Sequence, residues 1–192
     1  MDEGLAKIRH SRSKKNFPFL KLEDGEYVEF VFSRAKTYLL MLLGGLAIGV
    51  AVVLFVFLMV LIEQPVLDEM GMNFLFIILA TLIGVAVITA LVTLRIYNGN
   101  KLFITNQHAI QMIMTSPMAS SMNIIDLASI EDASFSQDGV LEKMFHFGTF
   151  RLATVGDETT YTFKYSYVSP DDLRTISELL TKAKKEMRKK ED

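Results

Sequence analysis

Residues 38–62 read YLLMLLGGLAIGVAVVLFVFLMVLI, and none of these 25 residues is charged. A helix of that length measures about 37 Å, which exceeds the roughly 30 Å hydrocarbon core of a bilayer. Residues 74–94, FLFIILATLIGVAVITALVTL, form a second uncharged stretch of about 31 Å. Neither stretch has a polar face, and a chain of 192 residues is too small to bury two such helices. The sequence therefore predicts a transmembrane hairpin over residues 38–94.

The charges that flank the two stretches predict how this hairpin is oriented. The link, residues 63–73, is acidic and contains no Lys or Arg, and its Pro65 is expected to end the first helix. The outer flanks are basic and carry Arg34, Lys36, Arg95 and Lys101. Because Lys and Arg are retained on the cytoplasmic side, we expect a multi-pass protein of the plasma (inner) membrane with both termini in the cytoplasm.

The composition outside the hairpin narrows the range of functions. Charged residues make up 22% of the chain and crowd outside the apolar stretches, and the net charge of −2 is unlike that of a dedicated nucleic-acid binder. The absence of cysteine excludes disulfides, thiolate nucleophiles and Cys-ligated metals. The three histidines, His10, His108 and His146, fit no metal or catalytic motif, and we interpret them as surface or turn residues. We expect no cofactor and no enzyme activity.

Small residues inside the apolar stretches are candidate helix-packing positions. Gly45 and Gly49 form a small-xxx-small pair, and Gly84 takes part in a similar spacing in the second stretch. Packing of the two helices on each other is the simpler interpretation, and association with another hairpin or a partner is the alternative. Neither stretch contains an ionisable residue, so this chain alone is not expected to transport ions or solutes.

The sequence before the hairpin divides into two parts. Residues 1–16 are polar and charge-rich, and we expect a flexible tail there. Residues 17–37 form a juxtamembrane segment in which an Asp24-Gly25 turn signal precedes alternating residues up to Phe32. Such alternation is typical of a short strand or of an amphipathic stretch at the lipid headgroups. The pattern does not choose between these two.

Short apolar runs separated by turn residues predict a small β-rich domain over residues 95–185, followed by a basic and acidic tail over 186–192. The expected strands are residues 101–104, 109–114, 122–125, 130–135, 149–154 and 160–165. A C-terminal helix should begin at Pro170 with Ser169 as its N-cap, and its apolar face should cover the open end of the sheet.

Several segments resemble, in order, motifs of bacterial pleckstrin-homology-like (PH-like) domains. Residues 100–110, NKLFITNQHAI, resemble the Y-x-LTxxR-hydrophobic opening, although His108 stands where Arg is common. Residues 125–130, IDLASI, resemble the IPL-x-x-I strand, and residues 141–150, LEKMFHFGTF, resemble the L-x-R-hydrophobic-hydrophobic-G-x-G-T segment, with Phe147 at a position where Gly or Tyr also occurs.

The resemblance extends to both ends of this region. Residues 163–170 are similar to the family's aromatic strand before a proline-led helix, and Gly25-Glu26 resembles the GE of membrane-anchored members of the YdbS and YdbT type. It implies an α+β membrane protein in which a two-helix transmembrane hairpin precedes a small PH-like antiparallel β-sandwich or open barrel capped by a C-terminal helix. Because the Arg is replaced by His108, a ligand role of that Arg does not carry over.

Three functions fit these observations. The first is a non-enzymatic, membrane-tethered interaction module whose cytoplasmic domain binds protein partners or self-associates into a homo-oligomer. The second is a sensor of anionic lipid headgroups, for which the basic run Lys182, Lys184, Lys185, Arg188, Lys189 and Lys190 offers contacts to the lipid bilayer, although a solvated helix end explains that run equally well. The third is an accessory subunit of a larger membrane transport complex. The basic residues of the β-region are dispersed, which favours the first.

Overall fold

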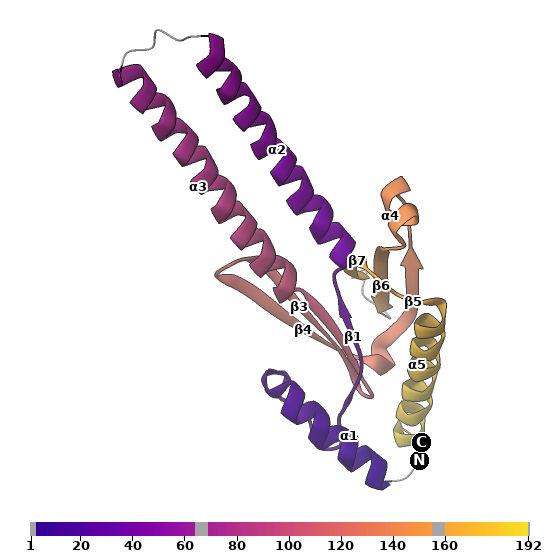
Figure 1. Cartoon of the computed structure of the whole chain (residues 1–192). Coiled ribbons are helices and arrows are strands. Elements are labelled where there is room, and N and C mark those ends of the chain that lie inside the picture. The colour runs from indigo at the N-terminus through magenta and orange to yellow at the C-terminus, as the bar shows by residue number, and fades with distance from the viewer. Residues whose placement is uncertain (1–2, 64–68, 155–159, 192) are drawn as a thin grey trace. The chain divides into compact units, whose positions relative to one another are not determined.

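The computed structural model (Figure 1) describes residues 3–63, 69–154 and 160–191. The chain forms two compact units. One, here called the hairpin unit, comprises residues 36–97, and the other, here called the sheet unit, comprises residues 1–35 and 98–192. The fold is α+β, with two long apolar helices, two antiparallel sheets and a C-terminal helix.

The hairpin unit consists of α2 (Lys36–Glu63) and α3 (Glu69–Gly99). Both helices are long and apolar enough to cross a membrane, over Lys36–Ile62 and Gly71–Gly99, and no part of their most apolar windows is buried within the structure. Each helix extends beyond the stretch predicted from its lack of charge, because helical geometry tolerates the polar residues at the ends. Residues 69–73, predicted as part of the link, are the first turns of α3. The predicted helix stop at Pro65 lies outside the described residues.

The structure corrects the expected packing of glycines inside the hairpin. A Cβ atom added at Gly45, Gly49 or Gly84 would meet no heavy atom within 4 Å among the described residues. The two helices therefore do not approach closely at these positions, and a shallow cavity of about 300 Å³ lies between them, with Gly49 in its lining. Larger side chains span the gap elsewhere, as in Phe57 and Phe76, whose ring centroids lie 5.7 Å apart. The alternative, packing against another chain, stays a prediction.

Polar groups within α3 are satisfied by the helix itself. The hydroxyl of Thr81 donates to the carbonyl of Ile77, and that of Thr89 donates to the carbonyl of Val85, each at 2.8 Å. Bonding to the carbonyl four residues earlier leaves no unpaired hydroxyl on the helix surface at these two positions.

The described residues of the sheet unit form seven strands in two antiparallel sheets. The first sheet has the order β1-β2-β3-β4 and the second has the order β5-β6-β7. Their bounds are β1 Val28–Ser33, β2 Lys101–Thr105, β3 His108–Ser116, β4 Ala119–Asp126, β5 Ile130–Ser136, β6 Gly148–Thr154 and β7 Thr160–Ser166. The six strands predicted from the apolar runs are confirmed, each within three residues at either end.

The strand β1 decides the question left open for the juxtamembrane segment. It pairs with β2 in the register Phe30↔Ile104, Phe32↔Leu102 and Ser33↔Lys101, although the whole hairpin unit separates the two strands in sequence. The strand interpretation of this segment is therefore correct for residues 28–33. A domain that begins at residue 95 is incomplete, because β1 supplies an edge of its first sheet.

One hydrophobic core lies between the two sheets and the C-terminal helix α5 (Pro170–Glu191). Alternation turns Leu102 and Ile104 of β2 into this core, where Phe150 of β6 and Ile176 of α5 are also fully buried. The predicted N-cap of α5 is confirmed: Ser169 Oγ accepts from the Asp172 amide at 3.0 Å, and Asp172 Oδ2 accepts from the Ser169 amide at 3.1 Å.

The prediction of a flexible tail is wrong for residues 3–16, which form helix α1 (Glu3–Asn16). Polarity suggested a tail, but specific hydrogen bonds fix the helix to β1: Ser13 is 7% exposed and its Oγ accepts from the Val28 amide at 3.0 Å. After α1, the short helix η1 (Pro18–Leu20) brings Leu20 onto Phe103, on the face of the first sheet opposite the main core.

A further helix, α4 (Val140–Phe145), lies where only turns were predicted between β5 and β6. Six residues are too few for a periodic pattern to stand out. Glu142 stabilises its first turn, because Oε2 accepts from the amides of Asp138 at 2.7 Å and Gly139 at 3.2 Å. The short helix η2 (Leu127–Ser129) connects β4 to β5.

Candidate functional site

A charged side chain is buried in the sheet unit next to a histidine. Glu26 is 2% exposed, and its Oε1 lies 2.9 Å from Nδ1 of His108. Thr105 Oγ1 donates to the same oxygen at 2.6 Å, and the Glu23 amide donates to Oε2 at 2.9 Å. A buried carboxylate needs such partners, because burial without them is costly. Glu26 lies two residues before the start of β1, and His108 is the first residue of β3.

The electrostatics of this cluster favour the ionised form of Glu26. Burial alone would raise the pKa of Glu26, but hydrogen bonds from Thr105, from the Glu23 amide and from His108, together with the charge of His108, outweigh burial and lower it below its ordinary value of 4.5. The neighbouring residue Tyr27 shows the opposite behaviour: burial, reinforced by the charge of Glu29, raises its phenol pKa above 10.0.

The histidine interpretation needs correction at one position. His108 was interpreted as a surface or turn residue, but it begins β3, is partly buried, and faces the Glu26 carboxylate. His10 of α1 also contributes, because its Nδ1 lies 2.6 Å from the Glu26 carbonyl oxygen. No residue pattern in the sequence links Glu26 to His108, since 82 positions separate them; only the pairing of β1 with β2 brings them together.

A groove, here called the α5 groove, opens beside this cluster. It consists of two adjoining hollows of about 420 and 270 Å³. Four residues line both hollows: Asn106 and Gln107 of the β2–β3 turn, and Ala183 and Glu186 of α5. The remaining lining residues that carry charge are Glu23, Glu29, His108, Asp126 and Lys182. Four carboxylates therefore face one lysine and one histidine. The groove is concave, polar and acidic in balance.

A second hollow, here called the α4–α5 pocket, is mostly apolar. It has a volume of about 530 Å³ and lies between the end of β5 and the start of α5. Its lining residues are Phe135, Gln137, His146, Tyr167, Val168, Ser169, Pro170 and Leu173. His146 ends α4 in the left-handed conformation, with φ of 57°. Gln137 closes the loop, since its Nε2 donates to the Phe147 carbonyl at 3.1 Å.

Helical periodicity spreads the basic run over one broad side of α5. Successive residues are rotated by about 100°, so Lys182, Lys184, Lys185 and Arg188 lie within about 160° of the helix circumference. Lys182 pairs with Glu186 at 3.8 Å, and Lys184 Nζ donates to the Glu131 carbonyl at 3.1 Å. The side chains of Lys189 and Lys190 lie outside the described residues. Two of the four described basic side chains are therefore engaged within the sheet unit.

The chemistry that the lining of the α5 groove offers is hydrogen bonding and charge pairing. Over residues 3–63, 69–154 and 160–191, no three His, Asp or Glu side chains are placed to share a metal ion. The α5 groove combines hydrogen-bonding turn residues with carboxylates, which suits a ligand that carries hydrogen-bond donors or positive charge. No family model, no curated protein and no solved structure matches this chain.

Proposed function

We propose that this protein is a non-enzymatic, membrane-tethered interaction module. The two apolar helices anchor it as a hairpin in the plasma membrane with both termini in the cytoplasm, and the sheet unit binds a segment of a partner protein. The basic flanks of the hairpin, Arg34, Lys36, Arg95 and Lys101, support that orientation. The four-stranded and three-stranded sheets closed by α5 support the assignment of the sheet unit as a PH-like domain.

The acidic balance of the α5 groove is the observation that carries this proposal. Anionic lipid headgroups would meet Glu23, Asp126 and Glu186 at its walls, and like charges repel. A basic or donor-rich protein segment meets complementary charge there. The groove thus favours a protein ligand over the headgroup-sensor alternative, which needs clustered Lys and Arg.

The position of the groove within the sheet unit supports the same choice. The turn that lines it follows Thr105, which pairs with Val28, whereas the residues that lead to the hairpin lie at the other end of the same strands, where Ser33 pairs with Lys101. The basic residues near the end of α5 lie at the groove end as well, because Ala183 and Glu186 line the groove. The α5 groove and the basic residues of α5 therefore lie at the end of the sheet unit opposite the residues that connect to the apolar helices.

Photo-crosslinking in intact cells tests this function. A photoreactive residue at Ala183, which lines the groove, is compared with one at exposed Ser177, which lies on another side of α5. An adduct of defined mass from position 183 alone supports the proposal, and its loss in an Asp126→Lys variant assigns it to the acidic wall. An adduct of twice the chain mass identifies a second copy as the partner. Equal adducts from both positions, or none from either, contradict the proposal.

A further inference from the structure

Five exposed apolar side chains lie at the end of the sheet unit from which the chain continues to the hairpin. That end is marked by Ser33, paired with Lys101, and by the bridge between Arg34 and Ser166. Gly148 pairs with Ser166, so both sheets end here. The exposed apolar residues of this end, here called the rim, are Met118, Val140, Leu141, Met144 and Tyr167.

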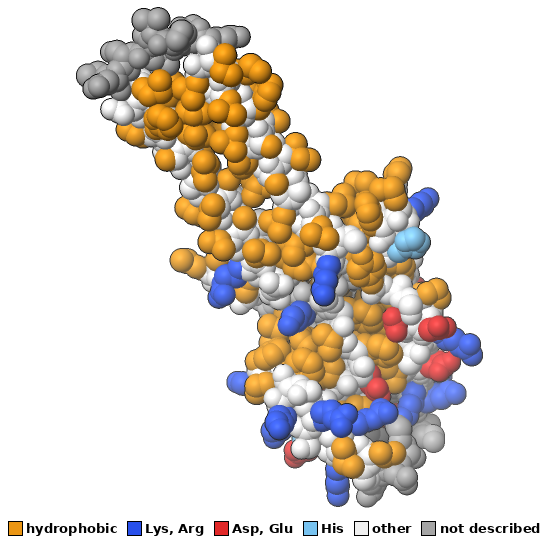
Figure 2. Space-filling model, in the orientation of Figure 1, with side chains coloured by type: hydrophobic (Ala, Val, Ile, Leu, Met, Phe, Trp, Pro, Cys, Tyr) orange, Lys and Arg blue, Asp and Glu red, His pale blue; other side chains and the backbone are white. Residues whose placement is uncertain are grey.

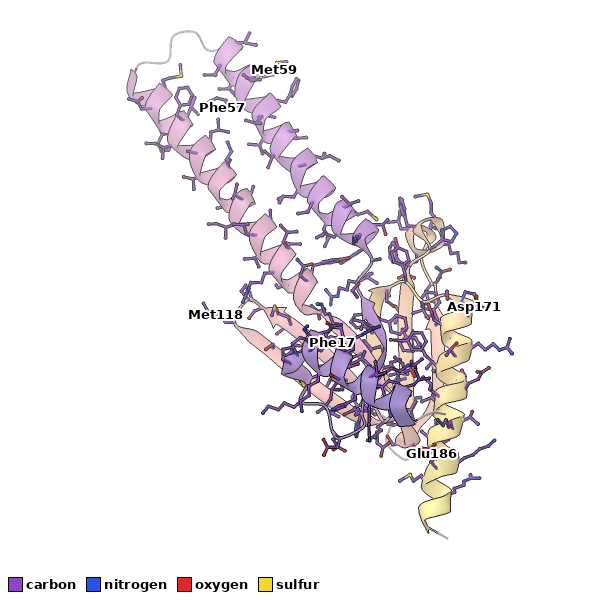
Figure 3. All side chains as sticks on the ribbon, turned by 60° about the horizontal axis from the view of Figure 1, so that its bottom comes forward. Phe17, Phe57, Met59, Met118, Asp171 and Glu186 are labelled. Carbon is purple, nitrogen blue, oxygen red and sulfur yellow. The ribbon has the colours of Figure 1, made fainter. Side chains whose placement is uncertain are left out.

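The β3–β4 hairpin extends the rim beyond the neighbouring strand. Lys101, the first residue of β2, pairs with Met112, but β3 continues to Ser116 and turns at Met118, which is 100% exposed. Figure 3 shows Met118 at the tip of this turn. At about 3.3 Å per residue, the extension from Met112 to the turn is roughly 15 Å long.

The chain that leads to α3 follows this extension. Asn100 Nδ2 donates to the Met114 carbonyl at 3.0 Å, and Asn100 Oδ1 accepts from the Met114 amide at 3.2 Å. A Cβ atom at Gly99 would lie 2.6 Å from Met114 Sδ, so the backbone passes directly against this side chain. The extension therefore runs beside Gly99 and Asn100, the residues at which α3 ends and the sheet unit continues.

Helix α4 supplies the second part of the rim. It follows β5 and precedes β6 at the ends of these strands, and Figure 1 shows it projecting beyond them. Val140 is 82% exposed, Met144 is 58% exposed and Leu141 is 47% exposed, although a short helix in water normally turns such residues inward. Figure 2 shows hydrophobic side chains gathered over this helix. Tyr167, 43% exposed, adds an amphipathic ring of the kind found at membrane interfaces.

Chain length limits how far Lys101 and Ser33, the two residues at which the sheet unit connects to the hairpin, lie from the uncharged stretches. Leu94 ends the uncharged stretch of α3, five helical residues before Gly99, and Lys101 follows two positions later. Those steps span at most about 15 Å, which matches the length of the β3–β4 extension. On the other side, only five positions separate Ser33 from Tyr38, where the first uncharged stretch begins.

We infer that the rim inserts into the headgroup layer of the same bilayer that holds the hairpin, with the tip at Met118 and the exposed face of α4 in contact with lipid. This inference rests on the proposed membrane anchoring of the hairpin. The contact is apolar, so it does not depend on anionic lipid. It fixes the orientation of the sheet unit and turns the α5 groove, at the opposite end of the strands, toward the cytoplasm.

Single-cysteine labelling tests the inference, because the native chain contains no cysteine. The full chain is placed in phosphatidylcholine nanodiscs at one copy per disc, and each variant carries an environment-sensitive fluorophore. Met118→Cys and Val140→Cys report on the rim. Met187→Cys, 47% exposed near the end of α5, is the matched surface control, and Phe55→Cys reports on α2 within the hairpin.

Quenching by nitroxide-labelled lipid and by aqueous iodide distinguishes the outcomes. We expect the labels at 118 and 140 to emit at shorter wavelength than the label at 187, and to be quenched more by a headgroup-level nitroxide than by one deep in the acyl chains. If iodide quenches the labels at 118 and 140 as strongly as the label at 187, the inference is overturned. If lipid nitroxide quenches the label at 55 in the same experiment, the membrane anchor still stands. Absence of lipid quenching at 55 contradicts the anchor itself.

A second copy of the chain is the competing occupant of the rim. Labels at 118 and 140 that are shielded from iodide only when two copies share a disc, with no quenching by lipid nitroxide, would assign the rim to self-association and overturn the lipid contact. A double variant, Met118→Asp with Val140→Asp, provides a further check, read from a label at Met144→Cys. Charged side chains on the rim should prevent its insertion into lipid, so iodide should reach the label at 144 fully. Both substituted side chains are exposed, so the fold should be retained.

Discussion

Glu26 and His108 come from the two sequence segments of the sheet unit, since Glu26 precedes α2 and His108 follows α3, and Glu26 Oε1 lies 2.9 Å from His108 Nδ1. Glu26 is almost fully buried, whereas His108 is partly exposed to the α5 groove. The pair therefore joins the two sequence segments of the sheet unit and contributes to the wall of the candidate binding groove.

Neutralising Glu26 should destabilise the sheet unit. In Glu26→Gln, the charge-assisted hydrogen bonds from Thr105 and His108 weaken, and an amide nitrogen replaces one acceptor oxygen, at an expected cost of about 1–3 kcal/mol in the free energy of unfolding. Urea unfolding of the full chain in detergent, followed by tyrosine fluorescence, measures this. Glu178→Gln, which breaks an exposed pair with Arg174, is the control and should change little. Equal effects of the two variants would contradict the role of burial.

Acid should weaken the fold through the same carboxylate. The pKa of Glu26 is lowered in the folded state, so its contribution to stability is fully present above pH 4.5 and is lost as the pH falls through the lowered folded-state value. We expect the difference in unfolding free energy between wild type and Glu26→Gln to shrink as the pH is lowered from 6 toward 3. A difference that stays constant over this range would show that Glu26 does not titrate with folding.

Substitutions of His108 separate its hydrogen bond from its ring shape. His108→Ala leaves Glu26 buried without this hydrogen-bond partner and should lower the free energy of unfolding by about 1–3 kcal/mol. His108→Arg should retain most of the stability, because a guanidinium can donate to the Glu26 carboxylate in place of the ring. Thermal unfolding of the two variants makes this comparison. Equal loss in both variants would show that the imidazole ring itself is needed.

Gly148 should be intolerant of a side chain. A Cβ atom there would collide with the backbone carbonyl oxygen of Ser136 and with the Phe135 ring, and overpacking of this kind costs about 1–3 kcal/mol. Gly148→Ala should lower the unfolding midpoint, whereas the same change at Gly139, where the nearest atom is 3.6 Å away, should have a smaller effect. A reversed order would mean that the β5–β6 pair can shift to accept the methyl group.

The sequence predicts the elements of this protein better than it predicts their partners. Uncharged runs are long enough to identify α2 and α3, and alternation with turn residues identifies the strands from β2 to β7. Helix α1 was missed because its residues are polar on every side, and its ordering depends on contacts such as that of Ser13 with Val28. These contacts are tertiary and leave no local pattern.

The candidate site was the least predictable part. His108 was noticed for its place in a motif, but its carboxylate partner lies 82 positions earlier and belongs to a strand whose pairing the pattern left open. The glycines of the hairpin suggested close packing from spacing alone, and spacing does not determine how far apart two helices lie. The basic residues of α5 form one run in sequence, but Lys182 pairs with Glu186 and Lys184 bonds to the Glu131 carbonyl, contacts that the run itself does not reveal.

The insertion of a hairpin between two adjacent strands also sets an order for biosynthesis. Val28 of β1 leaves the ribosome 77 residues before its partner Thr105, an interval of about 4–15 s at a translation rate of roughly 5–20 residues per second. Throughout that interval the apolar residues of β1 have no neighbouring strand. Translation of α2 and α3 must therefore come first, and the nascent β1 has to be kept from aggregating until translation supplies the strand that pairs with it.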